Sequence, residues 1–178
     1  MRRRTWLVFS VNLFLMAATA AMAQPPKVLE EISGKVVAVI DGDSLTLQRP
    51  DETKITVRLE GIDAPEGKQA YGEKSKEALA ALVLSKDVTV RKTGQDKGGR
   101  TLGIVLAGGE DINLQLVESG SAWHFKKYSK DKLLAEAEER ARAGKKGLWA
   151  GEDVIAPWEY RARNKINEPG STPAPKPQ

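Results

Sequence analysis

The sequence contains no cysteine and only one histidine, and this composition excludes several kinds of catalytic and metal site before any motif is considered. Without cysteine there are no disulfides, thiolate metal ligands or cysteine nucleophiles, so an apolar core must hold the fold together. The lone histidine, His124, has no second histidine or cysteine to form a zinc site, and we expect it not to be a ligand. Oxygen ligands remain, and they favour hard cations such as calcium or magnesium.

The N-terminus has the pattern of a signal peptide. Three arginines at positions 2–4 precede a nearly uncharged apolar run at 6–21, which ends in Ala21-Met22-Ala23. We expect residues 1–23 to be removed by cleavage between Ala23 and Gln24, and the mature protein to be secreted or periplasmic, with no attachment to a membrane. The alternative is a membrane anchor, but the apolar run is short for a span of roughly 20 residues.

Once this leader is set aside, the chain also lacks a strong charge of either sign. Three of the 28 basic residues lie in the leader and none of the 24 acidic ones does, so 25 basic and 24 acidic residues remain, a net charge of +1. Bulk charge therefore does not indicate nucleic-acid binding, and any affinity for phosphate must come from a local site.

The hydrophobic pattern predicts an α+β domain at 33–166, between a linker at 24–32 and a disordered Pro-rich tail at 167–178. Ile55, Val57 and Leu59 alternate with polar residues, so they share one face of a strand and Arg58 lies on the other. Five short strands crowded into one unit favour a five-stranded OB-type β-barrel with three α-helices. The strands are expected near 33–40, 45–48, 55–59, 88–90 and 102–106, and the helices at 73–84, 112–118 and 129–143, with Gly144 left-handed at the last helix end.

Acidic and basic side chains gather in three short segments. Asp41 and Asp43 share a tight turn, Asp63 and Glu66 follow in a loop, and oxygen ligands from two such segments can converge on one hard cation. Arg58 and Arg100 could each grip two phosphate oxygens through a planar guanidinium. Each feature has a plainer interpretation when taken alone, because Asp-Gly turns are common on surfaces and arginines often pair with carboxylates.

In combination, the three segments resemble the staphylococcal nuclease family. The resemblance rests on Val39 to Ser44, Arg58 to Glu66 and Asp96 to Arg100, and it continues to Gly147-Leu148-Trp149. It covers about residues 33–150, and its most specific part is Arg58-x-x-x-x-Asp63-x-Pro65-Glu66. It implies an OB barrel with three helices that hydrolyses DNA and RNA with Ca²⁺.

The resemblance also implies a role for each matching residue. Asp43 and Asp63 would ligate Ca²⁺ through carboxylates, Ala64 would do so through its backbone carbonyl, and Asp41 would lie just outside these ligands. Glu66 would orient or deprotonate the attacking water, and Arg58 and Arg100 would hold the phosphate. The residues expected to contact the nucleic acid are Lys97, Phe125 and Tyr128, whereas the tryptophans Trp123, Trp149 and Trp158 are expected to serve packing.

Two other interpretations of the domain stay open at this point. One is a non-catalytic OB-fold module that binds nucleic acid, and the other is a structural domain of the cell envelope stabilised by calcium. The presence of Arg58, Glu66 and Arg100 together favours the enzyme, because neither alternative needs all three. We therefore expect a calcium-dependent nuclease that acts on DNA, RNA or both as a monomer.

Overall fold

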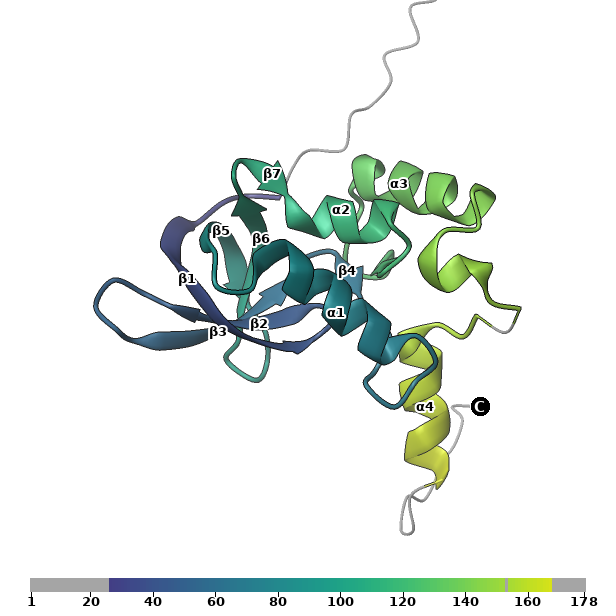
Figure 1. Cartoon of the computed structure of the whole chain (residues 1–178). Coiled ribbons are helices and arrows are strands. Elements are labelled where there is room, and N and C mark those ends of the chain that lie inside the picture. Colours follow the sequence, from purple (N-terminus) through teal and green to yellow (C-terminus); the bar gives the residue numbers. More distant parts are fainter. Residues whose placement is uncertain (1–25, 153, 168–178) are drawn as a thin grey trace, which may run out of the picture.

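Five strands close into a barrel in the computed structural model, which describes residues 26–152 and 154–167 (Figure 1). The strands follow the order β3-β2-β1-β5-β6, with antiparallel neighbours, and a parallel pairing of β3 with β6 closes the ring. Their bounds are β1 Glu30–Asp41, β2 Ser44–Gln48, β3 Lys54–Leu59, β5 Asp87–Gln95 and β6 Thr101–Ala107. The predicted OB-type barrel is confirmed.

Three two-residue strands complete the β structure. Strand β7 (Glu110–Asp111) extends the barrel sheet beside β6, while β4 (Ile62–Asp63) pairs with β8 (Trp123–His124) in a separate small sheet. Strands this short carry no periodicity, so the sequence pattern did not predict them. The β4–β8 pair matters for the site because it fixes Asp63 opposite Trp123.

The described residues form four α-helices where the pattern predicted three. They are α1 Gly72–Val83, α2 Ile112–Glu118, α3 Lys132–Ala143 and α4 Pro157–Asn167, with a 3₁₀ turn, η1, at Gly147–Ala150. The prediction missed α4, which begins with proline at its first position, as many helices do. Within the described part of the chain, no helix is both long enough and apolar enough to span a bilayer.

Several predicted boundaries differ from those observed. Strand β1 begins at Glu30, inside the expected linker, because Glu30 pairs with Lys92 of β5. Helix α3 begins three residues later than predicted because Asp131 caps it, accepting the Leu133 N–H at 2.8 Å. The expected signal peptide at 1–23 and all but the first residue of the expected tail at 167–178 lie outside the described residues.

The prediction that Gly144 is left-handed was wrong. Its φ is −81°, and the left-handed residue is the next one, Lys145, with φ 48°. The Gly144 N–H still donates to the Arg140 carbonyl at 3.0 Å, so the helix end closes without the usual glycine conformation.

The barrel interior is filled by aliphatic side chains from alternate strand positions. Val57 and Leu59 are buried while Arg58 lies on the other face, as the alternation predicted. In β6 the inward positions are Thr101, Gly103 and Val105. Helix α1 packs across the barrel through Leu79 and Val83 (Figure 1), and this arrangement holds the loop at its N-terminus near one end of the barrel.

Candidate active site

The acidic turn lies between β1 and β2, and its geometry is tight. The Asp43 N–H donates to Asp41 Oδ1 at 3.0 Å, and Asp43 is 1% exposed. A Cβ added at Gly42 would overlap Ser75 Oγ and come within 2.7 Å of the Ala64 Cβ. Only glycine fits this close approach, so the turn and the following loop are packed against each other.

Asp63 and Ala64 bring the second acidic segment to this turn. Asp63 lies in β4 and is fully buried, and the Ala64 N–H donates to Asp43 Oδ2 at 2.7 Å. The backbone of Ala64 therefore lies directly against the Asp43 carboxylate. Two segments twenty residues apart in sequence meet here, as the ligand prediction required.

Arg58 bridges the two buried aspartates. It is paired with Ser44 across β2 and β3, its Nη1 donates to Asp43 Oδ1, and its Nη2 donates to Asp63 Oδ1 at 2.7 Å. Burial alone would lower the pKa of Arg58, but the two carboxylates raise it above its usual range, so the guanidinium stays charged. Arg58 thus compensates carboxylate charge that the interior would otherwise not tolerate.

One guanidinium does not fully compensate this cluster. Burial raises the pKa of Asp43, Arg58 lowers it, and Asp41 and Asp63 raise it again, and together these effects place it at about 8. A carboxyl in this position ionises fully only if more positive charge lies beside it. A hard cation would supply that charge, and the available ligand atoms are carboxylate and carbonyl oxygens, so the residues fit a calcium ion.

The acidic ligands alone do not form a closed metal cage. Among residues 26–152 and 154–167 there is no group of three or more histidine, cysteine, aspartate or glutamate side chains that could hold a metal ion. Asp43 and Asp63 would supply two ligands, and the Ala64 carbonyl and water would have to supply the rest. A site of this kind keeps coordination positions open for water and substrate.

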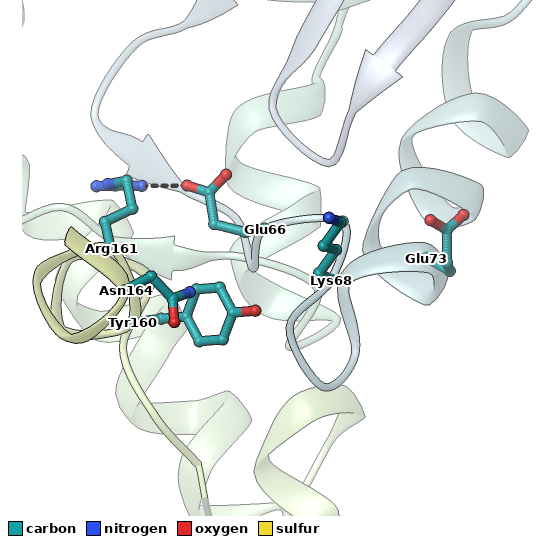
Figure 2. A pocket seen from close by; sticks show the side chains of 7 residues that line it. Glu66, Lys68, Glu73, Tyr160, Arg161 and Asn164 are labelled. Carbon is teal, nitrogen blue, oxygen red and sulfur yellow. Dashed lines mark hydrogen bonds and ion pairs between the residues drawn. The ribbon is translucent and has the colours of Figure 1, made fainter. Parts of the chain in front are cut away.

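Glu66 lies in the loop before α1, and its carboxylate meets an arginine that the sequence analysis did not identify. Arg161 of α4 donates through Nη1 to Glu66 Oε1 at 2.6 Å (Figure 2) and to Asp63 Oδ1 at 3.2 Å, and through Nη2 to Asp63 Oδ2 at 2.8 Å. Hydrogen bonding by Asp63 raises the pKa of Arg161 above its usual range. No sequence motif around Arg161 indicates this contact, since it joins residues 95 and 98 positions apart.

Within the described part of the chain, Arg100 makes no hydrogen bond or ion pair with this cluster and pairs with Asp96 instead. Its Nε donates to Asp96 Oδ2 at 2.6 Å, and its N–H donates to Asp96 Oδ1 at 2.9 Å. It directly precedes β6, whose residue Leu102 is paired with Arg58 of β3, so Arg100 enters the strand that neighbours Arg58. Lys97 is exposed in the same turn, directly after Asp96.

An aromatic and basic cavity of about 610 Å³ shares Arg161 with the carboxylate cluster. Phe125 stacks on Trp158 with ring centroids 5.4 Å apart and an interplanar angle of 9°, and it meets Tyr128 edge to face at 4.8 Å. Phe125 and Tyr128, both predicted to contact nucleic acid, therefore line one cavity. Arg161 lines this cavity and also a second one of about 540 Å³ that includes Glu66, Lys68 and Glu73 (Figure 2).

The tryptophans have the packing role expected of them, and His124 is buried behind them. Trp123 meets Trp149 and Trp158 edge to face, with centroids 4.4 and 5.3 Å apart. Burial lowers the pKa of His124, whose ring nitrogens have no hydrogen-bond partner within the described parts of the chain. His124 thus contributes to the wall of the aromatic cavity as a neutral ring.

Comparison with known proteins places these residues in a family. The family model described as staphylococcal nuclease homologue matches residues 56–151, more than half of the chain. A Haemophilus influenzae protein described as an uncharacterized endonuclease is 43% identical over 138 residues, 78% of each chain. A micrococcal nuclease of Shigella flexneri is 37% identical over 146 residues (76% of this chain, 83% of the relative), and the ParB protein of Escherichia coli is 33% identical over 172 residues (90% and 94%).

Proposed function

This chain belongs to the staphylococcal nuclease family and is a nuclease, and we propose that it hydrolyses phosphodiester bonds of DNA or RNA with calcium. The observation that carries the proposal is the meeting of Asp43, Asp63 and Glu66 at one end of the barrel, with Arg58 between the buried aspartates. Glu66 is the carboxylate of this set that is not buried, at 41% side-chain exposure, so water and substrate can reach it.

Calcium would be held by the carboxylates of Asp43 and Asp63 and by the backbone carbonyl of Ala64, with Asp41 just beyond them. When bound, the ion would polarise the phosphate and stabilise negative charge at the reacting phosphorus. Magnesium should substitute poorly, because it requires a smaller and stricter octahedron of ligands.

The chain's own side chains would do the remaining chemistry. Glu66 would hold the attacking water and accept its proton. Arg58 lies beside the proposed ligands and would bind a phosphate oxygen, and Arg100 would turn from Asp96 toward the same phosphate. That movement costs little, because the Arg100–Asp96 pair lies at the surface, where an ion pair contributes little stability.

The substrate strand would run from this centre into the aromatic cavity. Phe125 and Tyr128 offer faces on which a base can stack, and the nearby Lys126 and Lys127 offer charge for the phosphates. Lys97, exposed beside Arg100, would add a further phosphate contact.

Calcium removal tests the metal assignment. We expect cleavage of denatured DNA in the presence of Ca²⁺ and almost none in excess chelator, because the proposed ligands are all hard oxygens. Restoring Ca²⁺ should restore activity, which controls for irreversible unfolding by the chelator. Full activity in chelator would contradict the proposed role of Asp43 and Asp63.

We also propose that the protein is exported, on the basis of the arginine cluster, apolar run and Ala-x-Ala end of residues 1–23. Mass spectrometry of the mature protein from the cell envelope or medium should then find Gln24 at its N-terminus. Retention of Met1 in a membrane fraction would instead support an anchor.

A further inference from the structure

Helix α4 brings an arginine into the site from outside the part of the chain that the family model covers. The match ends at residue 151, and α4 spans Pro157–Asn167. Arg161 lies on its second turn and contacts both Asp63 and Glu66. These are a proposed calcium ligand and the proposed water-handling residue, so the position of α4 bears directly on the reaction.

The start of α4 is anchored independently of these charges. Trp158 stacks on Phe125 and meets Trp123 edge to face, and Ala156 is buried among the same aromatic side chains. Just before it, the Ile155 carbonyl accepts a hydrogen bond from Gln69 Nε2 at 2.7 Å. Trp158 and Arg161 are three residues apart on the helix, so they project from the same side. Arg161 is therefore held in place by packing.

Glu66 depends on a fixed hydrogen-bond donor such as Arg161 more than the other carboxylates of the site do. Asp43 and Asp63 are buried and tied to Arg58, whereas Glu66 belongs to a loop between β4 and α1 and is partly exposed. A glutamate in that setting has several accessible rotamers, and holding it in one of them costs conformational entropy. The 2.6 Å hydrogen bond from Arg161 selects the rotamer that faces Asp63.

The donor geometry also separates Arg161 from Arg100, the partly exposed arginine proposed to bind the phosphate. Both terminal nitrogens of Arg161 donate to carboxylates. Nη1 and Nη2 each donate to one oxygen of Asp63, and Nη1 also donates to Glu66. Arg100 uses its Nε and backbone N–H for Asp96, which leaves its terminal nitrogens for a phosphate. Hydrogen bonds of this kind to a metal-ligating carboxylate orient it. Asp63 Oδ1 accepts from both Arg58 and Arg161, whereas Oδ2 accepts only from Arg161 among the described residues and keeps a lone pair for the ion.

We propose that Arg161 is a positioning residue, which fixes the Glu66 carboxylate against Asp63 in the orientation needed to handle the attacking water. The inference rests on the proposed role of Glu66. Arg161 itself neither binds the phosphate nor transfers a proton; it acts through Glu66.

The Arg161→Ala variant tests this role. We expect kcat on single-stranded DNA with saturating Ca²⁺ to fall about 10- to 100-fold, the usual cost of removing a residue that orients a ligand or base, with KM changed much less. Arg161→Lys should lose less, because lysine keeps the charge but cannot span both carboxylates. Arg163→Ala on the same helix is the matched control, since Arg163 is exposed and its ion pair, within the described residues, is with Glu159 at 3.9 Å, and it should keep wild-type kcat.

A double-mutant cycle with Glu66→Gln gives the decisive readout. If Arg161 acts through Glu66, Arg161→Ala should lower kcat by less than about 3-fold in the Glu66→Gln background. Calcium affinity, measured by calorimetry without substrate, should change by a smaller factor than kcat, because the Ca²⁺ ligands stay in place. Circular dichroism must show folded protein. If the alanine variant unfolds, Arg161→Lys replaces it in the same double-mutant cycle.

Three outcomes would overturn the inference. Wild-type kcat in folded Arg161→Ala would do so, and so would a loss equally large with and without Glu66, because Arg161 would then act on the phosphate directly. Calcium binding ten-fold tighter in Arg161→Ala, with undiminished kcat, would identify Arg161 as a competitor of the ion. Wild-type activity of Glu66→Gln alone would instead refute the proposed function, which is a separate failure.

Discussion

Replacing Glu66 by glutamine should lower kcat by about 10²- to 10⁴-fold, the range observed when a general base is lost. The side chain keeps its size and can still accept a hydrogen bond from Arg161, but an amide cannot take a proton from water. The measurement is single-turnover cleavage of denatured DNA with saturating Ca²⁺, which separates the chemical step from product release.

Substrate and calcium binding should change little in this variant. Glu66 is not among the proposed Ca²⁺ ligands, so the calcium affinity measured by calorimetry should stay close to that of the wild type. Glu73→Gln is the matched control, because Glu73 lines the same cavity from the first turn of α1 (Figure 2) yet contacts none of the proposed catalytic residues in the described structure. A folded Glu66→Gln protein with near wild-type kcat would refute the catalytic assignment.

Removing Arg58 should have the largest effect on stability. In Arg58→Ala, Asp43 and Asp63 lose the cation that bridges them inside the protein, and breaking a buried ion pair by deleting one partner costs about 3–5 kcal/mol. Urea unfolding followed by circular dichroism measures this loss. Arg91→Ala is the control, because the Arg91–Glu31 pair is exposed on the barrel surface and should contribute less than about 1 kcal/mol.

The loss should also depend on pH, in a direction set by Asp43. The folded-state pKa of Asp43, about 8, lies above its ordinary value of 3.8, so protonation favours the folded protein. This contribution is complete below the ordinary value and is lost as the pH rises toward 8. Arg58 opposes the increase, so its removal raises the pKa of Asp43 further, and the variant continues to lose stability above pH 8.

The excess destabilisation of Arg58→Ala should therefore be nearly constant up to about pH 8 and larger by about 1 kcal/mol at pH 9 than at pH 6. The measurement compares the free energies of unfolding of wild type and variant at both pH values in the metal-free protein. A loss below 1 kcal/mol at both would show that the two aspartates do not depend on Arg58.

Local patterns in the sequence predicted the barrel strands and most of the site. The alternation of Ile55, Val57 and Leu59 identified β3 and placed Arg58 on its other face, because strand side chains alternate whatever the rest of the fold does. The order of the acidic turn, the loop with Glu66 and the turn before Arg100 was sufficient to recognise the family, since it is a property of the chain itself.

The inward face of β6 and the C-terminal end of α3 are features that local sequence patterns did not predict. Gly103 occupies an inward position of β6 where a Cβ would come within 2.7 Å of a Val90 methyl group on β5, so glycine fits there. The sequence around Gly103 does not indicate this crowding, because Val90 belongs to another strand. At the end of α3, both Gly144 and Lys145 are compatible with a helix terminus. In the structure Lys145 takes the left-handed conformation, and the N–H groups of Lys145 and Lys146 donate to the Arg142 and Ala141 carbonyls at 3.0 and 2.9 Å.

The charge network around Glu66 was decided by tertiary structure alone. Sequence reasoning found the carboxylates and two arginines, but Arg161 follows Glu66 and Asp63 by 95 and 98 residues and belongs to a helix that has no motif of its own. Its place depends on the stacking of Trp158 on Phe125, which sets where α4 begins and which way it runs. An ion pair forms wherever the fold brings opposite charges together, so its partners follow from the packing of distant elements and not from their spacing in the chain.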